Sequence, residues 1–248
     1  MLTVIINAFH VMKNIFPITN NQLLKIFLKI YDFLEQVKQT QHQSPKQSLK
    51  IAIEQLDKNT TETSIAIIHD LEQISHNHPD YHWIIIDILT TFVRQNACHY
   101  ILHNEAISNP SAKVRGDIQA ALTVIARRDV KKDPANEQLD LSYTDMRGAN
   151  LNGANLEQTN LYQANLAGAN LREANLEGAI LSASNLQGAN LHLANLKGAI
   201  LSASNLQSAN LSGANLYRAN LYLAQLHGVI LNDAILDGAN FKEAKFSE

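Results

Sequence analysis

Histidine is the residue type whose number and spacing in this chain most suggest chemistry. Among the 10 histidines, His99 and His103 lie four positions apart beside Cys98. On a helix this spacing places two imidazoles on one face, as metal ligands require. However, no acidic general base lies between them, and a chain with so many histidines places them freely on polar helix faces. We therefore predict no metal site, no catalytic residue and no cofactor, with a histidine-based metalloenzyme as the lesser alternative.

Two basic pairs, Arg127-Arg128 and Lys131-Lys132, form a short cationic run. Cations stabilise the C-terminal end of a helix, so we interpret the run as a solvated helix end. A site for a small anion or a nucleic acid is the alternative. The sequence contains no glycine-rich phosphate loop and places no Ser/His/Asp grouping, and His82 beside Trp83 is interpreted as structural.

The composition limits the classes of protein that remain. The chain has 248 residues, which suffices for one large domain or two small ones. Its formal net charge of -3 argues against a nucleic-acid partner, and its single cysteine excludes a disulfide framework and a cysteine-based zinc site. No secretory signal is evident before Lys13, and the first 12 residues are too few to span a bilayer, so we expect a cytoplasmic protein.

The composition changes near residue 139, where a repeat of five residues begins. From Leu141 to Phe246 every fifth residue is Leu, Met or Phe, over 22 consecutive positions that we call centres. A small residue, usually Ala, lies two positions before each centre, and Asn usually separates the two. Nine of the 10 glycines lie two positions after a centre. This regularity establishes an internal repeat.

A period of five fits neither regular secondary structure. On an α-helix, five residues turn the chain by roughly 140°, which distributes leucine around the whole cylinder. On a strand, an odd period points successive leucines to opposite faces. If the chain turns after every five residues, four sides close a square coil in which each centre and the preceding Ala point inward. Gly suits the corner because it adopts positive φ, and Asn tolerates similar geometry and can form side-chain ladders between coils.

Residues 139–248 resemble the pentapeptide-repeat proteins, whose pattern is Ala-(Asp or Asn)-Leu-X-X. The resemblance implies a right-handed quadrilateral β-helix of 22 repeats, or about 5.5 coils. We therefore predict an α+β protein with separate domains, an all-α domain over 1–138 followed by the β-helix over 139–248. The departures are few, because the Asn position is replaced only at Ile180, Ile200, Ile230, Ile235, Gln225 and Lys245.

Apolar spacing predicts that residues 1–138 are helical. We expect amphipathic helices within 1–40, above all at 23–37, a helical bundle over 44–128 and a linker over 129–138. Within the bundle, the pattern predicts helices at 44–58, 63–75, 80–96 and 116–128. Because a stacked coil has an open apolar end, we expect the last helices to cap the coil at Leu141.

The helical part also resembles the segment that precedes pentapeptide repeats in various bacterial proteins. The residues that carry this resemblance are His82-Trp83, Leu89 to Arg94, Asp117 to Ile125 and Arg127-Arg128. The resemblance implies no particular activity.

Sorting the outward residues of the repeat onto four sides gives two candidate contact surfaces. The candidate interaction face consists of Tyr162, Ile180, Ile200, Tyr222 and Leu223, on a side that carries no charge from Asn160 to Leu223. An apolar strip of this kind is typical of a contact surface, and the alternative is that the helical part folds back over it. The candidate end-to-end contact consists of Phe241 and Phe246, which either plug the last coil or meet another copy.

These patterns predict a non-enzymatic interaction or scaffold protein that presents a β-helical rod to an unidentified protein partner or to a second copy of itself. Leu, Ala, Asn and Gly offer no nucleophile or base. One alternative follows from the resemblance, because some pentapeptide-repeat proteins mimic DNA and bind gyrase-type topoisomerases. A mimic needs a strongly negative rod, whereas residues 139–248 hold nine acidic and six basic residues.

A membrane-associated regulator acting through the N-terminal amphipathic helices is the other alternative. Only two lysines line the polar face of the helix predicted at 23–37. Membrane-surface helices usually carry more cations than this, so packing on its own domain is the favoured role of that helix.

Overall fold

The computed structural model describes residues 45–56, 61–97 and 114–246, and the amphipathic helix predicted at 23–37 lies outside them. The chain divides into two compact units, Met1–Ile51 and Ala52–Glu248. α3 (Pro45–Leu56) crosses this division and begins at a proline, which is favoured in a first helical turn. Its buried apolar residues recur at the spacing of one helix face: Leu49, Ala52, Ile53 and Leu56.

Three further helices follow in the second unit, close to their predicted positions. α4 (Thr61–Asn77) and α5 (His82–Asn96) are separated by the short 3₁₀ helix η1 (Pro79–Tyr81), and α6 (Gly116–Ala126) packs against both. Pro79 lacks an N–H, which explains the interruption between α4 and α5. A second 3₁₀ helix, η3 (Val130–Lys132), lies within the predicted linker. The core of the three helices is aliphatic, with Ile68, Leu71, Ile85, Leu89, Ile118, Leu122 and Ile125 at most 1 % exposed.

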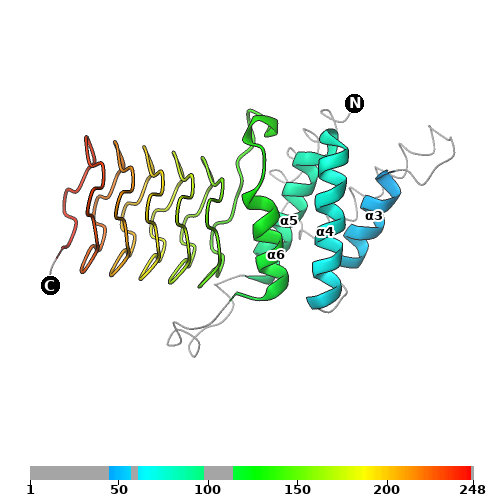
Figure 1. Cartoon of the computed structure of the whole chain (residues 1–248), viewed down its shortest axis with the longest axis horizontal. Helices are drawn as coiled ribbons and strands as arrows, with labels where there is room; N and C mark the ends of the chain where they lie inside the picture. The colour runs from blue at the N-terminus through cyan, green and yellow to red at the C-terminus, as the bar shows by residue number, and fades with distance from the viewer. Residues whose placement is uncertain (1–44, 57–60, 98–113, 247–248) are drawn as a thin grey trace, which may run out of the picture. The chain divides into compact units, whose positions relative to one another are not determined.

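From Leu139 the chain forms the predicted quadrilateral β-helix, whose stacked coils are visible in Figure 1. Parallel β-bridges join residues 20 positions apart, such as Asn150 with Asn170, so each coil contains four repeats. Every centre from Leu141 to Leu226 is at most 2 % exposed. The small residues two positions before these centres are also buried, which confirms the predicted inward pair.

The corners of the coil explain the glycines only in part. Every described residue two positions after a centre has positive φ, and these residues comprise nine glycines and 12 others such as Arg218. No asparagine among the described residues has positive φ, because none occupies a corner position, so Asn does not serve as a corner residue here. Asn instead lies in the bridges, where its side chain donates to the Asn of the preceding coil, as from Asn195 to Asn175 at 3.0 Å. The predicted ladder is therefore confirmed.

The helices close the first coil, as expected. The Gln119 side-chain amide of α6 accepts from the Asn150 N–H at 2.8 Å and donates to the Asn150 carbonyl at 2.9 Å. It thus replaces the peptide group that a preceding coil would supply. The backbone carbonyls of Ala97 and Ala126 accept the N–H groups of Asp145 and Asn155 in the same way. These bonds satisfy backbone groups that an open end would leave without partners.

Candidate functional site: an uncharged face of the coil

The structure places the five residues of the candidate interaction face on one side of the β-helix. Ile180 and Ile200 form a backbone β-bridge with each other. Ile180 also bridges to Asn160 in the preceding coil, and Ile200 bridges to Asn220 in the following coil. Ile200 and Leu223 are 39 % and 41 % exposed, and Tyr162, Ile180 and Tyr222 are half-buried. Because the bridges repeat every 20 residues, the backbone fixes the spacing of these side chains along the coil axis.

Aromatic residues mark both ends of this face. Tyr143, 41 % exposed, packs edge-to-face on Tyr162 with ring centroids 5.4 Å apart. At the other end, the Tyr222 hydroxyl donates to the Glu243 carboxylate at 3.2 Å, and this hydrogen bond raises the pKa of Tyr222. Tyr143 was not among the predicted residues of this face, although it occupies the same side one coil earlier.

The adjacent side of the coil also carries no Asp, Glu, Lys or Arg in these coils, a feature that was not predicted. Between Asn165 and Gly228 that side presents asparagine, glutamine, alanine, serine, glycine and one histidine, His227, at its outward positions, and no Asp, Glu, Lys or Arg. The charged residues of these coils lie on the two remaining sides, where Lys197 pairs with Glu177 at 2.7 Å and Arg172 with Glu173 at 2.7 Å. The hydrogen bond from Lys197 lowers the pKa of Glu177. Charge is thus confined to one half of the surface of these coils.

The candidate end-to-end contact lies at the last described coil. The rings of Phe241 and Phe246 have centroids 5.8 Å apart, and Phe246 is 49 % exposed. Leu236 of the same coil is 37 % exposed, in contrast to the buried centres of the preceding coils. Contact of this end with another copy stays a prediction.

The cationic run divides into two parts with different roles. The Arg127 side chain is 67 % exposed, as expected for a solvated helix end. The same interpretation is wrong for Arg128, which is only 4 % exposed. Because α6 ends before Arg127, the Arg128 guanidinium reaches the first coil, where it donates to the carbonyls of Asn155 and Glu157 and pairs with Asp133.

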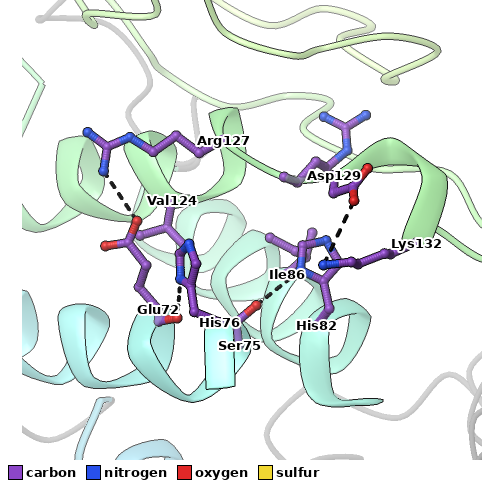
Figure 2. A pocket seen from close by; sticks show the side chains of 10 residues that line it. Glu72, Ser75, His76, His82, Ile86, Val124, Arg127, Asp129 and Lys132 are labelled. Atoms are coloured by element: carbon purple, nitrogen blue, oxygen red, sulfur yellow. Dashed lines mark hydrogen bonds and ion pairs between the residues drawn. The ribbon is translucent and has the colours of Figure 1, made fainter. Parts of the chain in front are cut away.

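A small cavity of about 110 Å³ lies beside this arginine, among α4, α5, α6 and the residues that follow α6 (Figure 2). His82 lines it, with Nδ1 3.0 Å from the Ser75 hydroxyl oxygen and Nε2 buried without a described partner. Burial lowers the pKa of His82, and the Asp133 carboxylate partly opposes this effect. The predicted structural role of His82 fits this burial.

Most of the polar side chains that line the cavity are hydrogen-bonded or ion-paired with one another. Ser75 lines the cavity but is only 7 % exposed, and its hydroxyl is already hydrogen-bonded to His82. The cations at the rim are already paired, Arg127 with Glu72 at 3.3 Å and Lys132 with Asp129 at 3.8 Å. Within residues 45–56, 61–97 and 114–246, no three His, Cys, Asp or Glu side chains lie close enough to bind a metal ion. Cys98, His99 and His103 lie outside those ranges.

Comparison with known proteins identifies the repeat. The family model for pentapeptide repeats matches in 8 copies, over residues 137–166, 159–198, 199–238 and 219–248. No curated protein sequence matches the chain. Solved structures also match part of the chain, among them the following three.

Rfr23 of the cyanobacterium Cyanothece 51142 shares 36 % identity, over 47 % of this chain and 69 % of that chain, with a TM-score of 0.31. HetL, involved in heterocyst differentiation regulation in Nostoc sp. strain PCC 7120, shares 33 % identity over 43 % of this chain, with a TM-score of 0.29. The match spans 63 % of HetL, less than two thirds of its length. QnrB1, a plasmid-mediated fluoroquinolone resistance protein, shares 20 % identity with this chain, and the match covers 44 % of this chain and 64 % of the QnrB1 chain, with a TM-score of 0.29.

Proposed function

Because the chain belongs to the pentapeptide-repeat family, we propose that it is a non-enzymatic interaction protein whose β-helix presents the candidate interaction face to a protein partner. The observation that carries this proposal is the uncharged, partly apolar strip from Tyr162 to Leu223, on a coil whose charges lie on other sides. The backbone bridges hold this surface in one shape, which lowers the entropic cost of binding. Right-handed winding, separate folding of the two parts and a cytoplasmic location belong to the same proposal.

Affinity capture with the intact chain as bait tests the role of the face. The variant is I180D/I200D, and its matched control is I230D/I235D, because Ile230 and Ile235 hold the same place in the repeat on the two other sides. Asp140 and Asp145 already occupy this place, so aspartate is compatible with the coil. We expect the first variant to lose the captured protein and the control to retain it. Equal capture by both would overturn the proposal.

The charge distribution argues against the alternative of a DNA mimic. Residues 139–248 carry nine acidic and six basic residues, and Lys197 and Arg172 neutralise acidic neighbours directly. A mimic of duplex DNA requires a far higher density of negative charge. We therefore expect the purified chain to leave the supercoiling activity of a gyrase unchanged. Inhibition at stoichiometric concentration would favour the mimic instead.

The alternative of a membrane-associated regulator depends on residues 1–40, which lie outside the described part of the chain. None of the described helices is long and apolar enough to cross a bilayer. Flotation of the intact chain with anionic liposomes tests the alternative, and we expect the chain to stay at the bottom of the gradient. Flotation that persists in I180D/I200D would assign membrane binding to another part of the protein.

A further inference from the structure

The order of residue types on the candidate interaction face is nearly the same from either end of the coil axis. Its midpoint lies between Ile180 and Ile200, which bridge each other. The residues one position after the centres are serine in the two middle coils and tyrosine in the two coils that flank them. In each coil, one residue before the centre and one residue after it face outward. From one end of the face to the other, these two residues are Asn160 and Tyr162, Ile180 and Ser182, Ile200 and Ser202, and Asn220 and Tyr222.

When a copy of this surface is turned end for end, isoleucine faces isoleucine and tyrosine faces tyrosine. We propose that a second copy of this chain occupies the face, with the two coils antiparallel and a two-fold axis between Ile180 and Ile200. The inference rests on the proposed function and names its partner. In this arrangement Ile180 faces Ile200 of the second copy, and Tyr162 faces Tyr222 of the second copy. Such an isologous contact closes, so it yields a dimer and no filament.

The ends of the face favour the antiparallel over the parallel arrangement. Lys242 and Glu243 lie on this side in the last coil, and Asp140, paired with Arg94 at 2.7 Å, lies on it in the first. A parallel pair would bring Lys242 to the same level as Lys242 of the second copy, and like charges at close range are destabilising. The antiparallel pair places Lys242 at the level of Asp140 instead.

The dimension of the face sets the expected strength of the dimer. Coils stack about 4.8 Å apart, so the four coils from Asn160 to Leu223 span roughly 15 Å. A standard interface buries about 800 Å² per partner, which is more than a strip of this length provides. No charged group on the strip must lose its hydration, and two isoleucines lie at its centre with a tyrosine toward each end. We therefore expect a weak dimer, with dissociation in the micromolar range.

Sedimentation velocity of the full chain, from low micromolar to near-millimolar concentration, tests the arrangement. The wild type should shift from monomer to dimer, and I180D/I200D should stay monomeric because it places four carboxylates in the contact. I180K/I200D should dimerise again, because only the antiparallel register pairs the introduced lysine with the introduced aspartate of the second copy. The control I230D/I235D should behave like the wild type. Aspartate and lysine occur at this place in the repeat as Asp140 and Lys245, so all variants should keep the wild-type circular dichroism spectrum.

Three results would overturn the inference: a wild type that is monomeric throughout, unchanged dimerisation of I180D/I200D, or an I180K/I200D variant that stays monomeric. If the wild type is monomeric but I180D/I200D still loses a captured protein that I230D/I235D retains, the proposed function stands and the second copy is the wrong partner. If neither dimerisation nor capture depends on the face, both proposals are wrong.

Discussion

The coil and the helical part of this protein are stabilised in two different ways. In the coil, a leucine centre, a buried small residue and one backbone bridge recur in almost identical surroundings. In the helical part, single buried polar side chains such as Arg128, Asp117 and His82 each have their own partners. A repeated frame leaves the outward positions free to vary, so the coil can carry a recognition surface. The unique contacts instead determine where the coil begins.

The largest effect expected is the loss of a unique contact. Arg128→Met should lower the free energy of unfolding by about 3–5 kcal/mol, because it leaves Asp133 and the carbonyls of the first coil without their buried donor. Denaturation with urea measures the change. Arg127→Met is the matched control and should cost at most about 1 kcal/mol, because the Arg127–Glu72 pair is largely exposed on the arginine side. Similar losses in the two variants would contradict the distinction between these neighbours.

Arg127 and Arg128 also show how far the sequence predicts this structure. The repeat from Leu141 to Phe246 predicts the coil, its inward residues and its cap, because the same residue types recur at the same positions of every repeat. The role of Arg128 depends on where α6 ends and on which carbonyls then lie within reach, and neither is a local property of the sequence. The uncharged second side follows from the same sorting of outward residues onto four sides, but its small polar residues, unlike Ile180 and Ile200, give no apolar signal of a contact surface.

A core substitution in the coil tests whether the two parts unfold separately. Leu191 is fully buried, and Leu191→Ala should cost about 2–5 kcal/mol through lost burial and a residual cavity. The single tryptophan of the chain, Trp83, lies in α5 and is 8 % exposed, so its fluorescence reports on the helical part. We expect the circular dichroism of the coil to change at a lower urea concentration while the Trp83 transition stays at its wild-type midpoint. A joint shift of both signals would show that the coil and the helices unfold as one unit.

A smaller, pH-dependent effect is expected at His82. Burial lowers its pKa below 6.5, with Asp133 and Asp129 opposing and Lys132 and Arg128 reinforcing the shift. The unfolded chain therefore binds the proton more readily, so the stability contributed by neutral His82 is present above pH 6.5 and is lost as the pH falls below it. The melting temperatures of the wild type and His82→Asn should diverge least at pH 5 and most at pH 8. The reverse trend would mean that the folded state favours charged His82.

The smallest effects are expected at the corners of the coil, where glycine and other residues share one backbone conformation. Gly168 has φ +65°, and a Cβ added there would lie in open space. Gly168→Ala should therefore lower the free energy of unfolding by only about 1 kcal/mol, through the strain of the left-handed backbone conformation. Ser208 has φ 57°, and Ser208→Gly should relieve that strain with a gain below about 1 kcal/mol, because glycine loses more chain entropy on folding. Thermal unfolding of the two variants should show a lower melting temperature for Gly168→Ala and a slightly higher one for Ser208→Gly. A loss above about 3 kcal/mol for Gly168→Ala would show that the corner is under a constraint beyond φ. The 12 corners that already lack glycine argue for the smaller value, since the bridges on either side hold the backbone in this conformation whatever residue occupies it.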